Sequence, residues 1–172
     1  MNHLKAMNDI TKRDDFTAVC TFTGHRPERL GEPEEKVIRF LEESIAKAME
    51  EGYTDFITGM QRGVDLWAAE IVLRLKEEGK PVRHIAACPF QGVERSWPAE
   101  WQRKYHYVLK KSDEVHVISE QPGRKAFLER NEWMVDHASR LIAVYTGAPG
   151  GTYQTILYAE KKGLKLVKYP QT

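Results

Sequence analysis

Three glycine-bearing loops carry the residues of this chain that could bind a charged ligand. Each loop follows an apolar, strand-like segment and precedes a helical one. Backbone N–H groups at helix starts attract anions, and an arginine in such a loop can hold a phosphate or carboxylate through two parallel hydrogen bonds. The loops are Thr23-Gly24-His25-Arg26, Thr58-Gly59-Met60-Gln61-Arg62-Gly63-Val64-Asp65 and Thr146-Gly147-Ala148-Pro149-Gly150-Gly151-Thr152. Each loop alone is a weak signal, but three of them favour an anion-binding cleft.

The first loop presents an arginine, and the other two present backbone N–H groups. Gly24 allows a ligand to come close, and Pro27 directs Arg26 into an extended conformation. In the third loop, two N–H groups and the Thr152 hydroxyl are expected to cradle a phosphate. The expected ligand-binding residues are Gly24, His25, Arg26, Gly59, Arg62, Gly63, Asp65, Gly150, Gly151 and Thr152.

No residue stands out as catalytic. Asp65 falls in the first turn of an expected helix, where the helix dipole stabilises a carboxylate, and it could meet a ribose hydroxyl or Arg26. Glu70 and Asp136 are weaker candidates, because a solvated glutamate and a helix-surface or capping aspartate explain them as well. No G-x-G-x-x-G follows the first strand and no glycine-lysine-serine/threonine ends a loop, which argues against a P-loop NTPase.

Alternating strands and helices must position these loops. Strands are expected from Val19 to the first glycine turn and at 55–58, 82–88, 113–118, 140–145 and 165–168; helices are expected at 34–51, 64–78, 97–109, 124–137 and 152–162. This alternation predicts an α/β fold, a Rossmann-like three-layer sandwich whose mostly parallel sheet has helices on both faces. Parallel strands would bring all three loops to one edge of the sheet. Residues 1–15 are expected to be a frayed N-terminal segment, and residues 16–172 a single domain.

Composition narrows the class of protein further. The chain has 172 residues and a formal net charge of +1, so nothing draws it as a whole toward nucleic acid or membrane. Its polar start does not resemble an export signal, which makes the cytoplasm the expected location. Cys20 and Cys88 lie in apolar runs and are expected to be buried thiols. The six histidines show no metal-ligand spacing, so no metal site is expected. Trp97 and Trp101 are expected in the core or in a homo-oligomer interface, with base stacking the less favoured alternative.

The motifs resemble the YpsA-like branch of the SLOG superfamily, which is named for the Smf/DprA and LOG proteins. The segments that carry the resemblance are Phe22-Thr23-Gly24-His25-Arg26-Pro27, Thr58-Gly59 with Gly63-Val64-Asp65 and Ala68-Ala69-Glu70, Asn131 through Met134-Val135-Asp136, and Ile142-Ala143-Val144-Tyr145 with Pro149-Gly150-Gly151-Thr152. The resemblance runs from Ala18 to the C-terminus. It implies a Rossmann-like domain for a nucleotide or nucleotide-derived ligand, such as a nucleotide-sugar, without a settled activity.

The chain departs from the enzymes of that superfamily at one decisive position. LOG phosphoribohydrolases carry P-G-G-x-G-T-x-x-E, and the related nucleoside deoxyribosyltransferases carry G-T-x-x-E, with a catalytic glutamate three residues after the threonine. Counting from Thr152 leads to Thr155, which cannot act as a carboxylate nucleophile or stabilise an oxocarbenium ion by charge. The resemblance therefore implies that the ligand cradle is kept without its usual catalytic acid.

Three hypotheses follow. The first is a module that binds a nucleotide or nucleotide-derived ligand, with no cofactor identified. The second is a nucleotide hydrolase or an enzyme of N-glycosidic bonds, with its carboxylate relocated to Asp65, Glu70 or Asp136. The third, least favoured because the chain has no basic excess, is a DprA-like binder of single-stranded DNA.

Overall fold

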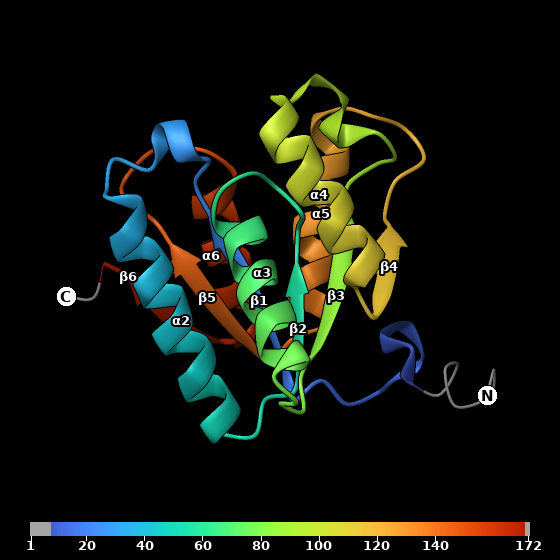
Figure 1. Cartoon of the computed structure of the whole chain (residues 1–172), viewed down its shortest axis with the longest axis vertical. Coiled ribbons are helices and arrows are strands. Elements are labelled where there is room, and N and C mark those ends of the chain that lie inside the picture. Colours follow the sequence, from blue (N-terminus) through green and yellow to red (C-terminus); the bar gives the residue numbers. More distant parts are fainter. Residues whose placement is uncertain (1–7, 171–172) are drawn as a thin grey trace.

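One six-stranded sheet lies between two layers of helices (Figure 1). The computed structural model of the chain describes residues 8–170. The strands are β1 (Val19–Gly24), β2 (Asp55–Thr58), β3 (Arg83–Cys88), β4 (Glu114–Val117), β5 (Arg140–Val144) and β6 (Lys165–Tyr169). The helices are α2 (Glu34–Glu50), α3 (Val64–Glu77), α4 (Ala99–Lys111), α5 (Arg124–Asp136) and α6 (Gly151–Lys162), with short 3-10 turns η1 (Ile10–Lys12), η2 (Pro27–Arg29) and η3 (Val93–Ser96). The predicted Rossmann-like α/β sandwich is confirmed.

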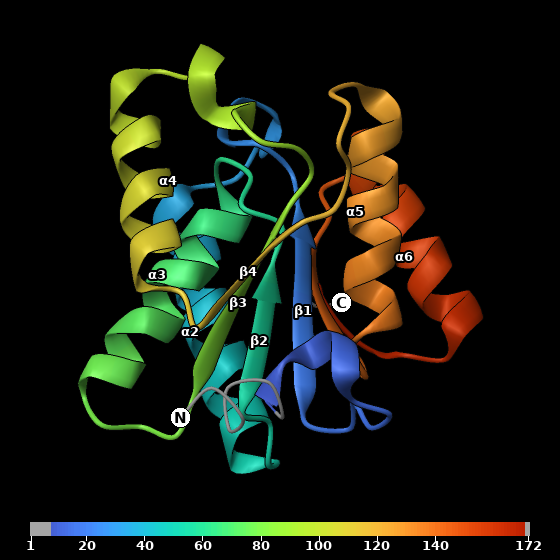
Figure 2. The same cartoon turned by 90° about the vertical axis from the view of Figure 1, so that its right-hand side faces the viewer.

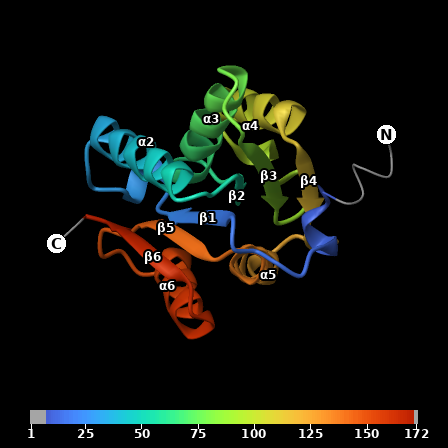
Figure 3. The ribbon, with the colours of Figure 1, turned by 90° about the horizontal axis from the view of Figure 1, so that it is seen from below.

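The order of the strands places a topological switch point between β1 and β5. The sheet runs β4-β3-β2-β1-β5-β6, and every neighbouring pair is parallel. Helices α2, α3 and α4 cover one face and α5 and α6 the other (Figures 2 and 3). The chain therefore changes direction across the sheet between β1 and β5. In open α/β sheets, ligands bind beyond the carboxyl ends of strands at such a switch point.

The core forms because the central strands are apolar on both faces. All five residues of β5 are buried, as are all four of β2 and five of the six in β1. Helix α2 packs one apolar stripe, with helical spacing, onto this sheet. Its members are Val37, Phe40, Leu41, Ile45 and Ala48.

The largest departure in secondary structure lies before α4. Trp97 was expected inside this helix, but it follows η3 and is separated from α4 by Pro98, which occupies the N-cap position. A proline is tolerated at a helix start and disfavours helical backbone in the residue before it. Trp97 is therefore placed in the loop after β3, and this position matters for the site described below.

The segment before β1 is packed against the sheet rather than frayed. Of the residues 1–15 that were expected to fray, residues 1–7 lie outside the described part of the chain. In the remainder, Ile10 is fully buried, and its backbone N–H donates to Glu114 Oε1 at 3.0 Å. Arg13 forms an ion pair of 2.5 Å with the buried Asp55. One apolar side chain and two polar contacts thus hold residues 8–15 in place.

Two further findings concern the cysteines and the possibility of a membrane-spanning helix. Cys20 and Cys88 are both buried free thiols, as predicted. Within residues 8–170, no helix combines the length and the apolar character needed to cross a membrane.

Candidate functional site

The three glycine-bearing loops meet at the carboxyl edge of the sheet, as the sequence predicted. Gly24 and Val144 are paired in register, so the first and third loops leave the sheet side by side. The backbone N–H of Thr146 donates to His25 Nε2 at 3.1 Å and joins these loops across the switch point. Burial, followed by the charge of Arg29, lowers the pKa of His25. A neutral His25 therefore serves as an acceptor that ties two loops together.

The first and second loops are packed closely against each other. A Cβ on Gly63, whose φ is +90°, would stand 3.1 Å from the His25 carbonyl oxygen. Arg62 donates to both carboxylate oxygens of Glu28, at 2.8 and 3.2 Å. The guanidinium of Arg62 was expected to bind ligand, but in this structure it already holds a carboxylate.

A hollow of about 310 Å³ opens beside these two loops. Its walls combine cationic, amide and aromatic side chains from four segments of the chain, among them Arg26, Gln61, Arg62, Phe90, Trp97 and Phe127. Arg26 is exposed, and Phe90 and Phe127 meet edge to face at 5.7 Å. None of the described residues of the third loop lines the hollow, so the expected pairing of Arg26 with that loop around one phosphate is absent from this cavity.

Asp65 is a buried acid beneath the second loop. Its Oδ2 accepts the backbone N–H of Gln61 at 3.2 Å, whereas its buried Oδ1 has no hydrogen-bond partner. Burial raises the pKa of Asp65 to about 6, against the opposing effects of the Arg130 charge and the Gln61 hydrogen bond. An unpaired, desolvated carboxylate at a sheet edge is typical of a functional position.

The backbone of the loop between β2 and α3, just before Asp65, is strained. Met60 is fully buried and has a φ of +61°, which is rare for a residue with a side chain. Such backbone outliers cluster at ligand sites and catalytic sites. The strain lies in the loop between β2 and α3, and the buried acid follows it in the first turn of α3.

Arg130 links the second loop to the third, and the sequence prediction missed it. This α5 side chain is buried, donates to the carbonyl of Gly59, and donates through Nε to Asn131 Oδ1 at 2.9 Å. Asn131 Nδ2 lies 3.6 Å from the position that a Cβ on Gly151 would take. The signal was available: Arg130 occupies the inward stripe of α5, where an apolar side chain is expected.

The third loop ends in the start of helix α6. Gly150 is the N-cap residue with a φ of +133°, Gly151 begins the helix and Thr152 is buried. The hydroxyl of Thr155 donates to the Gly151 carbonyl at 2.7 Å. Thr155, at the position of the catalytic glutamate in the resembling enzymes, is thus used inside the helix.

The other two acidic candidates lie away from the hollow. Glu70 is on α3, where its Oε1 accepts from Lys104 at 3.2 Å. Asp136 is the last residue of α5, which runs from the carboxyl edge back to the amino edge of the sheet; there it accepts from the Tyr158 hydroxyl at 2.8 Å. Asp65 does not line the hollow either, but it is hydrogen-bonded to the backbone of Gln61, which does.

Solved structures of DNA processing protein A share this fold. The protein from Streptococcus pneumoniae (DprA) aligns with a TM-score of 0.60 and 21% identity over 91% of this chain and 51% of that one. The Helicobacter pylori protein, whose structure concerns its mode of binding single-stranded DNA, aligns with a TM-score of 0.65 and 18% identity over 92% of this chain and 67% of that one. The chain thus spans about half of the first protein and two thirds of the second.

Relatives in sequence are of similar length to this chain. UPF0398 protein BH1768 of Halalkalibacterium halodurans is 30% identical over 84% of this chain and 80% of its own length. The SPbeta prophage-derived protein YoqJ of Bacillus subtilis is 32% identical over 74% of this chain and 80% of its own length. The family YpsA, described as the YspA SLOG family, matches residues 20–170, and the chain therefore belongs to this family.

Proposed function

We propose that this protein binds a nucleotide or a nucleotide-derived ligand at the carboxyl edge of its sheet. The observation that carries the proposal is the hollow of about 310 Å³, which is lined by Arg26 together with the aromatic side chains of Phe90, Trp97 and Phe127. Ligand sites combine apolar and aromatic walls with a few polar groups, and this is the composition of the hollow.

Each part of a nucleotide has a chemical counterpart here. The exposed guanidinium of Arg26 can take a phosphate through two hydrogen bonds. Aromatic faces take a base by stacking, a contribution of about 1–3 kcal/mol for each base. The Asp65 carboxylate does not line the hollow, but its Oδ1 is unpartnered and it lies beneath Gln61, which does, so we assign it the sugar hydroxyl. The proposal assigns the phosphate to Arg26, the base to the aromatic wall and the sugar to Asp65.

Replacing Arg26 with alanine is expected to weaken binding at least tenfold. Losing a charge-assisted hydrogen bond to a phosphate removes about 1.5–3 kcal/mol. The measurement is isothermal titration calorimetry against a panel of nucleoside mono-, di- and triphosphates and nucleotide-sugars. Arg39→Ala is the matched control, because Arg39 is an exposed arginine on α2, outside the hollow.

Two outcomes would contradict the proposal. One is the absence of binding by any compound of the panel. The other is equal affinity in the Arg26→Ala and Arg39→Ala proteins. A single-stranded oligonucleotide belongs in the same titration, because the H. pylori DprA structure concerns such DNA. Binding of the oligonucleotide with a steep salt dependence, and of no mononucleotide, would replace the small ligand with single-stranded DNA.

The raised pKa of Asp65 favours a second candidate function, in which the bound nucleotide is cleaved. A carboxyl group that titrates near pH 6 can give or take a proton at neutral pH. If Asp65 is the relocated acid, chromatography should detect a cleaved product, such as a free base, from at least one compound of the panel. Asp65→Asn should lower the rate by about 100-fold or more, the usual contribution of a general acid or base. If a compound of the panel binds and no product forms, the function is binding alone.

A further inference from the structure

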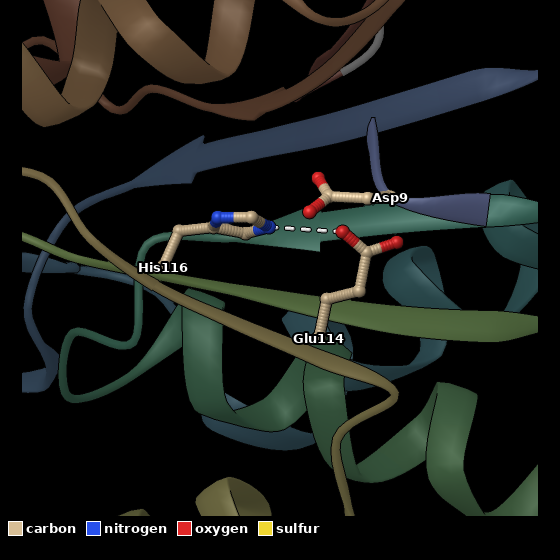
Figure 4. Close-up of side chains that lie close together, drawn as sticks. All are labelled: Asp9, Glu114 and His116. Atoms are coloured by element: carbon tan, nitrogen blue, oxygen red, sulfur yellow. Dashed lines mark hydrogen bonds and ion pairs between the residues drawn. The ribbon is translucent and has the colours of Figure 1, made fainter. Parts of the chain in front are cut away.

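Three side chains with metal-ligating atoms converge where the N-terminal segment meets the edge strand β4. Asp9 comes from the residues before β1, and Glu114 and His116 come from β4; one ligand atom of each lies within 4.8 Å of the other two (Figure 4). Residues two apart in a strand point to the same face, so Glu114 and His116 form a natural pair of ligands. This cluster shares no residue with the hollow at the carboxyl edge.

Hydrogen bonds from neighbouring residues hold both carboxylates in place and leave possible metal-ligand atoms directed toward the centre of the cluster. The Asp9 Oδ1 atom accepts from the Thr11 backbone N–H at 2.9 Å and from its hydroxyl at 2.6 Å, so Oδ2 takes part in neither bond. Glu114 Oε2 accepts from Arg83 at 2.7 Å, and Oε1 accepts the Ile10 N–H at 3.0 Å and is hydrogen-bonded to His116 Nε2 at 2.9 Å. Groups that orient the ligands in this way are a regular part of metal sites.

Charge also favours a cation at this point. Two carboxylates of like charge lie close together, and the Glu114 side chain is only 12% exposed. Arg83 forms an ion pair with Glu114, but it is shared with Asp55. Two carboxylates and one shared arginine therefore favour a further positive charge at the cluster.

We infer that Asp9, Glu114 and His116 form a zinc-type divalent-cation site that fastens the N-terminal segment to strand β4. One imidazole nitrogen and two carboxylate oxygens are a ligand set that Zn²⁺ accepts, with water completing a tetrahedron. The bridge joins Asp9 to residues more than a hundred positions later in the sequence, on the edge strand of the sheet.

The inference is tested by thermal unfolding with added ZnCl₂ in a buffer that does not chelate metals. At a free zinc concentration about 100 times the dissociation constant, the midpoint of the wild-type protein should rise by about 5–10 °C. Asp9→Asn and His116→Gln should lose this rise. Because each variant is compared with itself, with and without zinc, its own stability does not enter the result.

The chain offers a matched control for the aspartate. Asp15 accepts from the backbone N–H and hydroxyl of Thr17 in the same arrangement as Asp9 with Thr11, without belonging to the cluster. Asp15→Asn should therefore keep the full response to zinc. Mg²⁺ should give a much smaller response, because it prefers an octahedron of oxygen ligands. Equal zinc responses in wild type, Asp9→Asn and His116→Gln, or no response in wild type, would overturn the inference.

Discussion

Asp65→Asn is expected to make the protein more stable at neutral pH, by about 2–3 kcal/mol in the free energy of unfolding. The wild-type carboxyl has its pKa raised from 3.8 to about 6 in the folded state, mainly by burial. Its ionisation at pH 7 therefore opposes folding. Asparagine keeps the shape of the side chain and an oxygen for the Gln61 N–H, but it carries no charge.

Because the pKa of Asp65 is raised in the folded state, the stability difference between wild type and Asp65→Asn depends on pH. Below pH 3.8 Asp65 is protonated in both the folded and unfolded states, so wild type and variant should differ little. As the pH rises toward 6, the unfolded carboxyl ionises freely while the folded one resists, and wild type loses stability relative to the variant. Above about pH 6 the difference should reach a plateau.

Urea unfolding at intervals from about pH 4 to pH 8 measures this difference directly. Asp15→Asn is the control of opposite sign, because hydrogen bonds from Thr17 lower the pKa of Asp15, and its removal should give no gain at neutral pH. If the difference in free energy of unfolding between wild type and Asp65→Asn does not change across this pH range, burial does not raise the pKa of Asp65 in the folded protein. Asp65→Asn should also bind the nucleotide ligand more weakly. A variant that is more stable but binds more weakly would show that the Asp65 charge serves binding at a cost in stability.

Much of the fold could be predicted because local signals and tertiary structure agree. Strand β2 has the predicted bounds, since glycines flank a short apolar run on both sides. The shared edge of the three loops follows from parallel strands alone, and no contact had to be known. The helix-start glycines of the third loop were also identified, because a glycine cluster between an apolar strand and a periodic segment is typical of a loop that leads into a helix.

The parts that could not be predicted depend on contacts between distant residues. The place of Arg130 on the inward stripe of α5 could be read from the sequence, but its role could not, because that role depends on the carbonyl of Gly59, 71 positions earlier. The polar composition of residues 8–15 concealed the single buried Ile10 that anchors them. Likewise, spacing along the chain cannot bring Asp9 to the pair formed by Glu114 and His116.

The sequence alone also does not show whether a glycine leaves space for a ligand or for a neighbouring side chain. Gly24 was expected to let a ligand approach, but its Cα faces helix α3. A Cβ there would stand 2.6 Å from the Cβ and 2.9 Å from the Cγ1 of Val64. The structure thus gives Gly24 a packing role, which holds the start of α3 against the end of β1.

Gly24→Ala is therefore expected to destabilise the fold by about 3 kcal/mol, the upper part of the range for overpacking a core. For a chain of this length, the midpoint of thermal unfolding should fall by about 6–12 °C. Val64 cannot turn away, because a β-branched side chain in a helix has one strongly preferred rotamer. The measurement is thermal or urea unfolding followed by circular dichroism, with Gly151→Ala as control. A Cβ on Gly151 meets only Asn131 Nδ2 at 3.6 Å, so that change should be neutral or slightly stabilising.

A double-mutant cycle separates this packing role from a general intolerance of alanine at Gly24. Val64→Ala removes both γ-carbons that a Cβ on Gly24 would meet, although the Val64 β-carbon remains. The double variant should therefore be more stable than the sum of the single changes predicts, by about 1 kcal/mol, within the range measured for residues in contact. Strict additivity would show that the two positions do not compete for space, and the intolerance would then belong to the backbone of the first loop. A positive coupling would show that Gly24 and Val64 compete for the same space, so that the absence of a side chain at position 24 lets the start of α3 lie against the end of β1.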